Sequence, residues 1–151
     1  MGRTVEIVRE ARMENVAELR DFVWEAARRE GADEEACFDL KLAVDEACTN
    51  IVEHGYAGLP PGPIVVTFQR EADRLIVTIR DHARPFDPEA VPPPDLESDW
   101  PERPVRGLGW HLIRRTMDEV SLASDGERGN RLTLVKSCNP IKQETRSTKE
   151  T

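Results

Sequence analysis

Residues 46–56 read E-A-C-T-N-I-V-E-H-G-Y and close a stretch in which apolar side chains recur every three or four positions. This spacing predicts one face of an α-helix. The helix is expected to start near Asp33 and to stop at His54-Gly55, where glycine is free to adopt a positive φ. Its apolar face carries Ala36, Leu40, Ala43, Val44, Ala47, Cys48 and Ile51. Glu46 and Asn50 are four positions apart, so they lie one above the other at the border of that face.

The segments on either side of this helix predict further short elements. Residues 4–10 are rich in β-branched side chains and predict an edge strand. An amphipathic helix follows, with Asn15 as its N-cap and Gly31 just past its end. The remaining expected elements are strands at 64–68 and 75–79, a helix at 108–119, and strands at 120–123 and 131–135. Because the connections are short, we predict an α+β fold, a two-layer sandwich with helices on one face of a mixed, mainly antiparallel sheet.

Proline content separates a long loop from these elements. Residues 83–106 contain seven prolines, which the interior of a helix or strand does not accommodate. A compact domain rarely keeps so long a loop unless the loop has a function, so we predict an active-site lid. One domain is expected over residues 1–136, followed by a polar tail, 137–151, that we expect to be flexible.

Composition excludes several classes of protein. The 151 residues carry 21 basic and 29 acidic side chains, a net charge of −8, and 38 % are hydrophobic. A chain of this size buries enough surface to fold without a disulfide or a structural metal. The three cysteines, Cys37, Cys48 and Cys138, form no C-x-x-C pair and predict reduced thiols. No apolar run approaches the ~20 residues of a membrane span, so a cytoplasmic protein is expected. The scattered basic residues do not favour a nucleic-acid partner.

Three groups of residues are candidates for chemistry. Glu46 and Asn50 suit either a solvated helix edge or a site where a carboxylate takes a proton and an amide oxygen binds Mg²⁺. Asp81 ends a strongly predicted strand, and it would serve either as a turn initiator or as the acceptor for the exocyclic amine of adenine. In the second role it would reject guanine, which presents a carbonyl at that position.

The third group is R-G-L-G, residues 106–109, where the proline-rich segment ends and a helix begins. Glycines there allow close approach of the backbone, and the free N–H groups of a helix N-terminus favour a phosphate. A simple hinge is the alternative. The stretch matches neither a P-loop nor a dinucleotide-binding fingerprint.

Taken in order, the three stretches E-A-C-T-N-I-V-E-H-G-Y, D-H-A-R-P-F-D-P and R-G-L-G-W-H-L-I-R-R-T-M-D-E-V resemble the histidine-kinase-like ATPase superfamily. Within it, the chain is most similar to the anti-sigma factor serine-kinase family, which shares the pattern E-x-x-x-N-x-x-x-H-G-Y. The resemblance spans roughly residues 4–136. It implies the histidine-kinase-like (Bergerat) ATPase fold, binding of ATP with Mg²⁺, and phosphorylation of a protein serine.

The resemblance also implies roles for single residues. Glu46 matches the general base, Asn50 the Mg²⁺ ligand and Asp81 the residue that reads adenine. Arg106, Gly107, Leu108 and Gly109 match the glycine box around the phosphates. Ala83 and Phe86, in the stretch that follows the adenine reader, are also expected to bind the nucleotide. The implied partners are a sigma factor and an anti-sigma factor antagonist, and a homodimer is implied as well.

Two positions depart from the family pattern. Ala83 stands where the family has the glycine of D-x-G, so its methyl group would crowd the base or require a negative φ. Trp110 stands where a small aliphatic side chain is usual.

Two hypotheses for the function follow. The first, from the resemblance, is a protein-serine kinase that also sequesters a sigma factor. The alternative, from the departure at Ala83, is a non-catalytic module that binds a regulatory partner with a weakened or lost nucleotide site.

Overall fold

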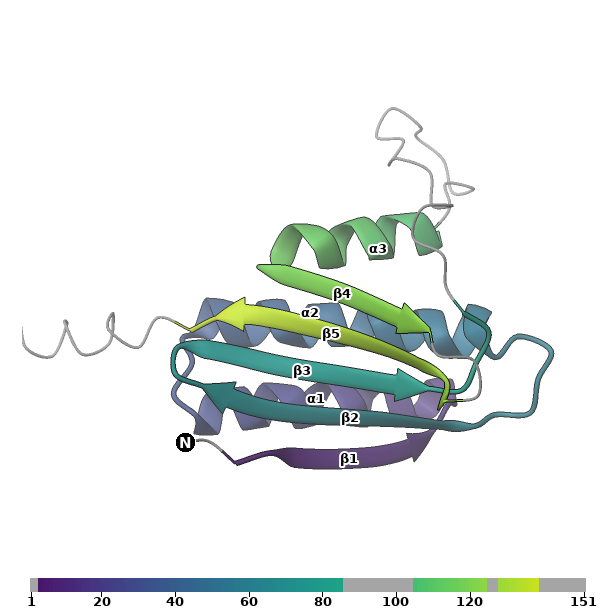
Figure 1. Cartoon of the computed structure of the whole chain (residues 1–151), viewed down its shortest axis with the longest axis horizontal. Helices are drawn as coiled ribbons and strands as arrows, with labels where there is room; N and C mark the ends of the chain where they lie inside the picture. The colour runs from purple at the N-terminus through teal and green to yellow at the C-terminus, as the bar shows by residue number, and fades with distance from the viewer. Residues whose placement is uncertain (1–2, 86–104, 125–127, 139–151) are drawn as a thin grey trace, which may run out of the picture.

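Alternating apolar and polar side chains build a sheet with one covered face. The computed structural model describes residues 3–85, 105–124 and 128–138, and within them five strands form one sheet in the order β1-β2-β3-β5-β4. The elements are β1 (Val5–Glu10), α1 (Met13–Arg29), α2 (Glu34–Asn50), the π-helical turn η1 (Ile51–Gly55), β2 (Pro63–Glu71), β3 (Arg74–Asp81), α3 (Val105–Thr116), β4 (Glu119–Ser124) and β5 (Asn130–Ser137). Figure 1 shows this arrangement.

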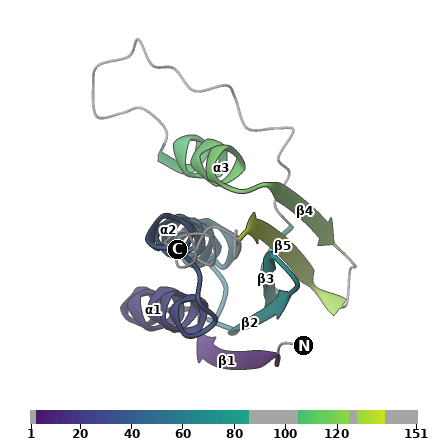
Figure 2. The same ribbon diagram turned by 90° about the vertical axis from the view of Figure 1, so that its left-hand side faces the viewer.

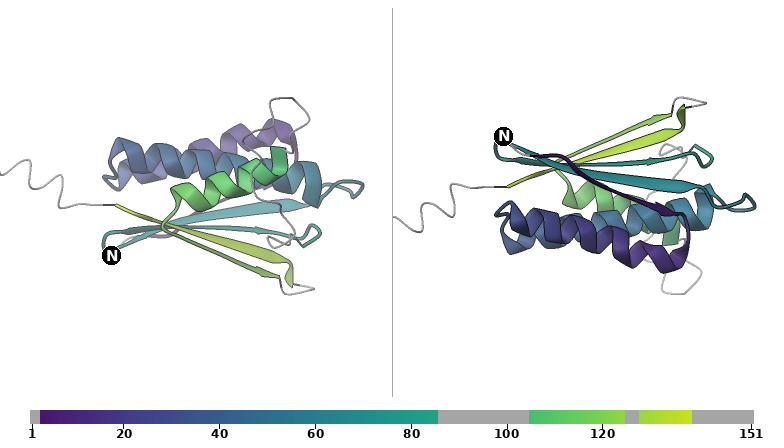
Figure 3. Two further views of the ribbon diagram at one scale, coloured as in Figure 1. Left: turned by 90° about the horizontal axis from the view of Figure 1, so that it is seen from above. Right: turned by 90° about the horizontal axis from the view of Figure 1, so that it is seen from below.

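The molecule has two layers. Seen end-on, α1, α2 and α3 lie on one side and the strands on the other (Figure 2). The views from above and below agree (Figure 3). The predicted α+β sandwich is confirmed, with one refinement. Every strand pair is antiparallel, so the described sheet is not mixed.

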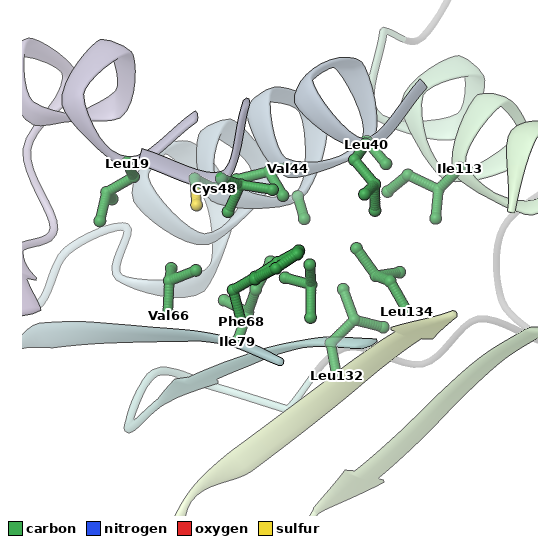
Figure 4. Packing of buried hydrophobic residues seen from close by; sticks show 14 of the residues in the cluster. Leu19, Leu40, Val44, Cys48, Val66, Phe68, Ile79, Ile113, Leu132 and Leu134 are labelled. Carbon is green, nitrogen blue, oxygen red and sulfur yellow. The ribbon is translucent and has the colours of Figure 1, made fainter. Parts of the chain in front are cut away.

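The core fills the space between the layers. On β2 and β3 the buried side chains alternate with more exposed ones, as period-2 patterning requires. The labelled core residues of Figure 4 are Leu19 of α1, Leu40, Val44 and Cys48 of α2, Ile113 of α3, and Val66, Phe68, Ile79, Leu132 and Leu134 of the sheet. Each fully buried side chain of this kind contributes about 1.5–3 kcal/mol relative to an exposed one. Cys37, Cys48 and Cys138 are buried and unbridged, as predicted.

Helix boundaries differ from the predictions in three places. Asn15 is not the N-cap of α1, since the helix starts at Met13 and the Asn15 amide donates to Glu10 O at 3.0 Å. Gly55 does not adopt a positive φ. The chain instead widens into η1, where Tyr56 N donates to Ile51 O at 2.9 Å, a five-residue step. The third helix runs from Val105 to Thr116, so it both begins and ends three residues before its predicted bounds of 108 and 119.

Two predicted features fall largely outside the described residues. The first is the predicted lid, of which residues 86–104 lie outside the described part of the chain. The second is the predicted tail, of which residues 139–151 lie outside it. None of the helices that the structure describes combines the length and the apolar character needed to cross a bilayer.

Candidate functional site

A pocket of about 200 Å³ opens where α2, η1, α3 and the ends of β3 and β5 meet. The apolar side chains of its wall are those of Ala47, Ile51, Ala83, Pro85, Trp110, Ile113, Leu122 and Leu132. Polar groups come from Asn50, His54, Asp81, Arg84 and Asn130. An apolar cavity with a few polar groups at defined places suits a small, largely apolar ligand. Trp110 is 5 % exposed and forms part of both the core and this wall.

Asp81 lies at the end of β3 with its side chain in the pocket wall. It is 7 % exposed, and burial raises the pKa of its carboxyl, while hydrogen bonds from Asn130 and Ala83 act in the opposite direction. Ala83 N and Asn130 Nδ2 both donate to Oδ1, each at 2.8 Å. Among the described residues, the hydrogen bonds that Asp81 accepts all reach Oδ1, so Oδ2 is the oxygen left to accept from a ligand.

Asn130 is a residue of this site that the sequence reasoning missed. It pairs with Asp81 across the β3–β5 ladder and is 7 % exposed. Its Nδ2 also donates to Ala83 O at 2.9 Å, and its Oδ1 accepts from Ser124 Oγ at 2.8 Å. The amide therefore joins β4, β5 and the chain after β3. The available signal was an uncharged polar residue at the start of a strongly apolar strand.

Glu46 and Asn50 both lie on α2 close to Gly109 of α3. A Cβ placed on Gly109 would lie 2.5 Å from Glu46 Oε1 and 3.7 Å from Asn50 Nδ2. A side chain at position 109 would therefore require the Glu46 carboxylate to move. Desolvation raises the pKa of Glu46, with smaller contributions from the neighbouring charges of Asp45 and Glu53.

Ala83 fits the site without strain. Within the described residues, the one non-glycine with a positive φ is Ala72, at the β2–β3 turn, so Ala83 does not need the freedom of glycine. Its methyl group faces Gly55, where an added Cβ would come within 2.8 Å of it. Positions 55 and 83 thus share a space with room for one methyl group. In this chain the methyl group of Ala83 fills it, and residue 55 is glycine.

The other predicted residues are placed less fully. Arg106, Gly107 and Leu108 lie in the first turn of α3, immediately before Gly109, where the free backbone N–H groups of a helix are found. Phe86 lies outside the described residues.

Magnesium fits the donor chemistry of this site only with help from a ligand. Within residues 3–85, 105–124 and 128–138, no three His, Cys, Asp or Glu side chains gather to hold a metal ion. Mg²⁺ is usually held by one or two protein oxygens together with phosphate oxygens and water, and the Asn50 amide supplies one such oxygen.

Comparison with known proteins identifies the family. The model of the histidine kinase-like ATPase domain matches residues 9–136. The chain belongs to the histidine kinase-like ATPase family. It is 34 % identical over 119 residues to the serine-protein kinase RsbW of Bacillus cereus, covering 76 % of this chain and 74 % of that protein. It is 39 % identical over 103 residues to the RsbW of Listeria monocytogenes, covering 66 % of each.

A solved structure supports the fold of this histidine kinase-like ATPase. The crystal structure of the RsbU and RsbW domains of Rv1364c from Mycobacterium tuberculosis matches with a TM-score of 0.65 at 20 % identity. The match covers 90 % of this chain and 32 % of that one, so the chain spans about a third of that protein.

These relatives place the ATPase domain among the anti-sigma factor kinases. The predicted family, fold and activity of an ATP-dependent serine-protein kinase are therefore confirmed. The alternative of a non-catalytic binding module is not favoured.

Proposed function

We propose that this chain transfers the γ-phosphoryl group of Mg·ATP to a serine of an anti-sigma factor antagonist, and that it also binds a sigma factor. One observation carries the proposal. Asn50 lines a pocket whose wall also contains the buried side chain of Asp81, and Glu46, one helical turn before Asn50, lies beside Gly109 of α3. The three sequence stretches that resemble the anti-sigma factor kinases thus meet around a cavity.

Adenine would be read at the Asp81 end. Ala83 N and Asn130 Nδ2 donate hydrogen bonds to Asp81 Oδ1, and Asp81 Oδ2 would accept a hydrogen bond from the exocyclic amine of adenine. A carboxylate that must pair with a donor rejects a purine that offers a carbonyl there, because a buried acceptor is left unpaired. The apolar wall with Ala47, Ile51 and Trp110 would contact the faces of the base.

Phosphoryl transfer would occur at the Glu46 end. The serine hydroxyl oxygen attacks the γ-phosphorus, the new O–P bond forms, and the bond to the β–γ bridging oxygen breaks as ADP leaves. The hydroxyl proton goes to the Glu46 carboxylate, whose raised pKa makes it a better base than an exposed glutamate. The first turn of α3, with Arg106 and Gly107, would bind the phosphates through its backbone N–H groups.

Asn50 would hold the magnesium ion through its amide oxygen. The ion supplies charge neutralisation to the phosphates when it is bound. Asn50 and Glu46 are one helical turn apart, so the metal and the base would act on the same phosphate from one helix.

The rest of the proposal concerns partners and place. We propose a homodimer that acts in the cytoplasm, where a sigma factor and its regulators are found. The net charge of −8 suits protein partners better than nucleic acid.

Calorimetric titration with Mg·ATP and with Mg·GTP tests the nucleotide site. Small proteins that copurify with the chain are then incubated with γ-phosphate-labelled ATP, and phosphoserine is identified in them. We expect ATP to bind more tightly than GTP and label to appear on serine of a copurifying protein. Binding of neither nucleotide would refute the proposal.

A further inference from the structure

Tyr56, the last residue of the stretch E-A-C-T-N-I-V-E-H-G-Y, has no role in the proposed reaction. It is nevertheless only 6 % exposed, and its hydroxyl acts both as a hydrogen-bond donor and as an acceptor. The hydroxyl accepts from His82 N at 3.0 Å and donates to Pro63 O at 3.2 Å. It therefore joins three segments: the end of η1, the start of β2 and the residue after Asp81.

The backbone after Asp81 is held at each of its three amides. His82 N donates to Tyr56 Oη at 3.0 Å, Ala83 N to Asp81 Oδ1 at 2.8 Å, and Arg84 N to Gly55 O at 3.1 Å. Two of the three partners belong to the neighbouring residues Gly55 and Tyr56. The Arg84 guanidinium also donates to Gly55 O and Ala57 O. The end of η1 and Tyr56 thus hold residues 82–84 through hydrogen bonds from both the backbone and the side chains.

The space around Tyr56 is fitted to its hydroxyl. A Cβ placed on Gly62 would lie 2.6 Å from Tyr56 Oη, so only glycine there admits the phenol. Burial raises the pKa of Tyr56, which keeps the hydroxyl protonated and able both to donate and to accept. Loss of the hydroxyl would leave His82 N and Pro63 O without this partner at a partly buried position.

We propose that Tyr56 is a positioning residue for Asp81: through the His82 amide it fixes the backbone from which the adenine-reading carboxylate projects. The inference deepens the proposed function and rests on it. Asn130 holds the Asp81 carboxylate itself, whereas Tyr56 holds the peptide that follows it. With both in place, Oδ2 has one position relative to the pocket, and the base is read with one geometry.

The test is Tyr56→Phe, which removes the hydroxyl and keeps the ring. Hydrogen exchange of the amides of residues 82–84 is measured in the ligand-free protein, followed by the affinities for Mg·ATP and Mg·GTP and the kinetics of transfer. We expect faster exchange at His82, ATP affinity and KM weakened about tenfold, a smaller ATP-to-GTP preference, and kcat at saturating ATP within about twofold of the wild type.

Phe68→Leu is the matched control. Phe68 is buried in the core on β2 and does not line the pocket, so its truncation lowers stability without touching residues 81–84. We expect it to leave the ATP-to-GTP preference unchanged. If Tyr56→Phe behaves like this control, losing stability alone, the positioning role is wrong.

The two proposals fail in different ways. A wild-type chain that binds no ATP would overturn the proposed function. Unchanged exchange at residues 82–84 in Tyr56→Phe would overturn the role of Tyr56, whatever the nucleotide result.

Discussion

Glu46 and Asp81 are both carboxylates with raised pKa values, and their surroundings suit them to different work. Asp81 is held by two donors at one oxygen, which fixes it as an acceptor. Glu46 is half-buried beside Gly109, and its pKa is raised mainly by desolvation. A fixed acceptor suits recognition, whereas a carboxylate with an elevated pKa suits proton transfer.

Glu46→Gln should separate binding from chemistry. The amide keeps the size of the side chain beside Gly109, so ATP affinity is expected to stay within about threefold of the wild type. Phosphoryl transfer should fall about 10²–10⁴-fold, because no group takes the hydroxyl proton. Calorimetry measures the first quantity and single-turnover labelling the second. Equal loss of binding and transfer would contradict the role of Glu46 as a base.

Two controls support this test. Glu35→Gln, at an exposed position in the first turn of α2, should change neither quantity. The pH profile of the wild type supplies the other control. The base must be ionised, so transfer should decline as the pH falls through the raised pKa of Glu46, which lies above that of an ordinary glutamate. Glu46→Gln should lack this limb of the profile.

Asp81→Asn should exchange function for stability. Burial raises the pKa of Asp81, so above that pKa the ionised carboxylate favours the unfolded chain, and a neutral side chain removes this cost. The Oδ1 of asparagine can still accept from Ala83 N and Asn130. We expect an unchanged or higher Tm of the ligand-free protein, ATP bound at least about tenfold more weakly, and loss of the preference for ATP over GTP.

Asp73→Asn, at the turn between β2 and β3, is the control for the Tm and for the nucleotide affinities. It changes charge in the same way at the far end of β3 from the pocket. Unchanged discrimination between ATP and GTP in Asp81→Asn would remove Asp81 from the adenine-reading role.

At the scale of elements, the junction between η1 and the end of β3 is where this chain departs from its family pattern. The π-helical turn ends at Gly55. A Cβ added to Gly55 would lie 2.8 Å from the methyl group of Ala83. The two positions share one space, so a side chain on one requires glycine on the other. Their substitutions should therefore be coupled.

A double-mutant cycle measures this coupling. Gly55→Ala alone should lower the free energy of unfolding by about 1–3 kcal/mol through overpacking. Adding Ala83→Gly should recover most of that loss, giving an interaction energy of about 1–2 kcal/mol. Urea unfolding of the four proteins gives the values, and ATP titration of the same set shows whether the junction also affects the pocket. Additive effects of the two substitutions would mean that the chain relaxes elsewhere.

The same elements show what sequence reasoning could reach. Strand alternation and helical spacing predicted all eight helices and strands described here apart from η1, because each pattern is local. The role of Asn15 was wrong because α1 already begins at Met13, with Arg12 as its N-cap, and the Asn15 amide bonds back to Glu10. Asn130 and Tyr56 were missed as parts of the site because their partners lie 49 and 26 positions away and meet them only in the folded protein.

At the scale of the whole molecule, the pocket joins segments that are distant along the chain. Its wall takes side chains from α2, η1, α3, β4 and β5, and from the residues that end and follow β3. A nucleotide held there contacts parts of both layers at once. It would bind the folded chain and not the unfolded one, so binding should raise the stability of the domain as a unit.

Mg·ATP should therefore raise the Tm of the protein. At a ligand concentration 100 times Kd, the stabilisation is about 2.7 kcal/mol, which for a domain of this size raises Tm by roughly 5–10 °C. Mg·GTP at the same concentration should give a clearly smaller increase, if Asp81 reads the base as proposed, because its carboxylate would then face the guanine carbonyl. Excess EDTA should reduce the effect of ATP, because the charge of the phosphates is then no longer neutralised by Mg²⁺. Thermal unfolding followed by circular dichroism measures all three. Equal increases with ATP and GTP would show that the pocket binds phosphates without reading the base.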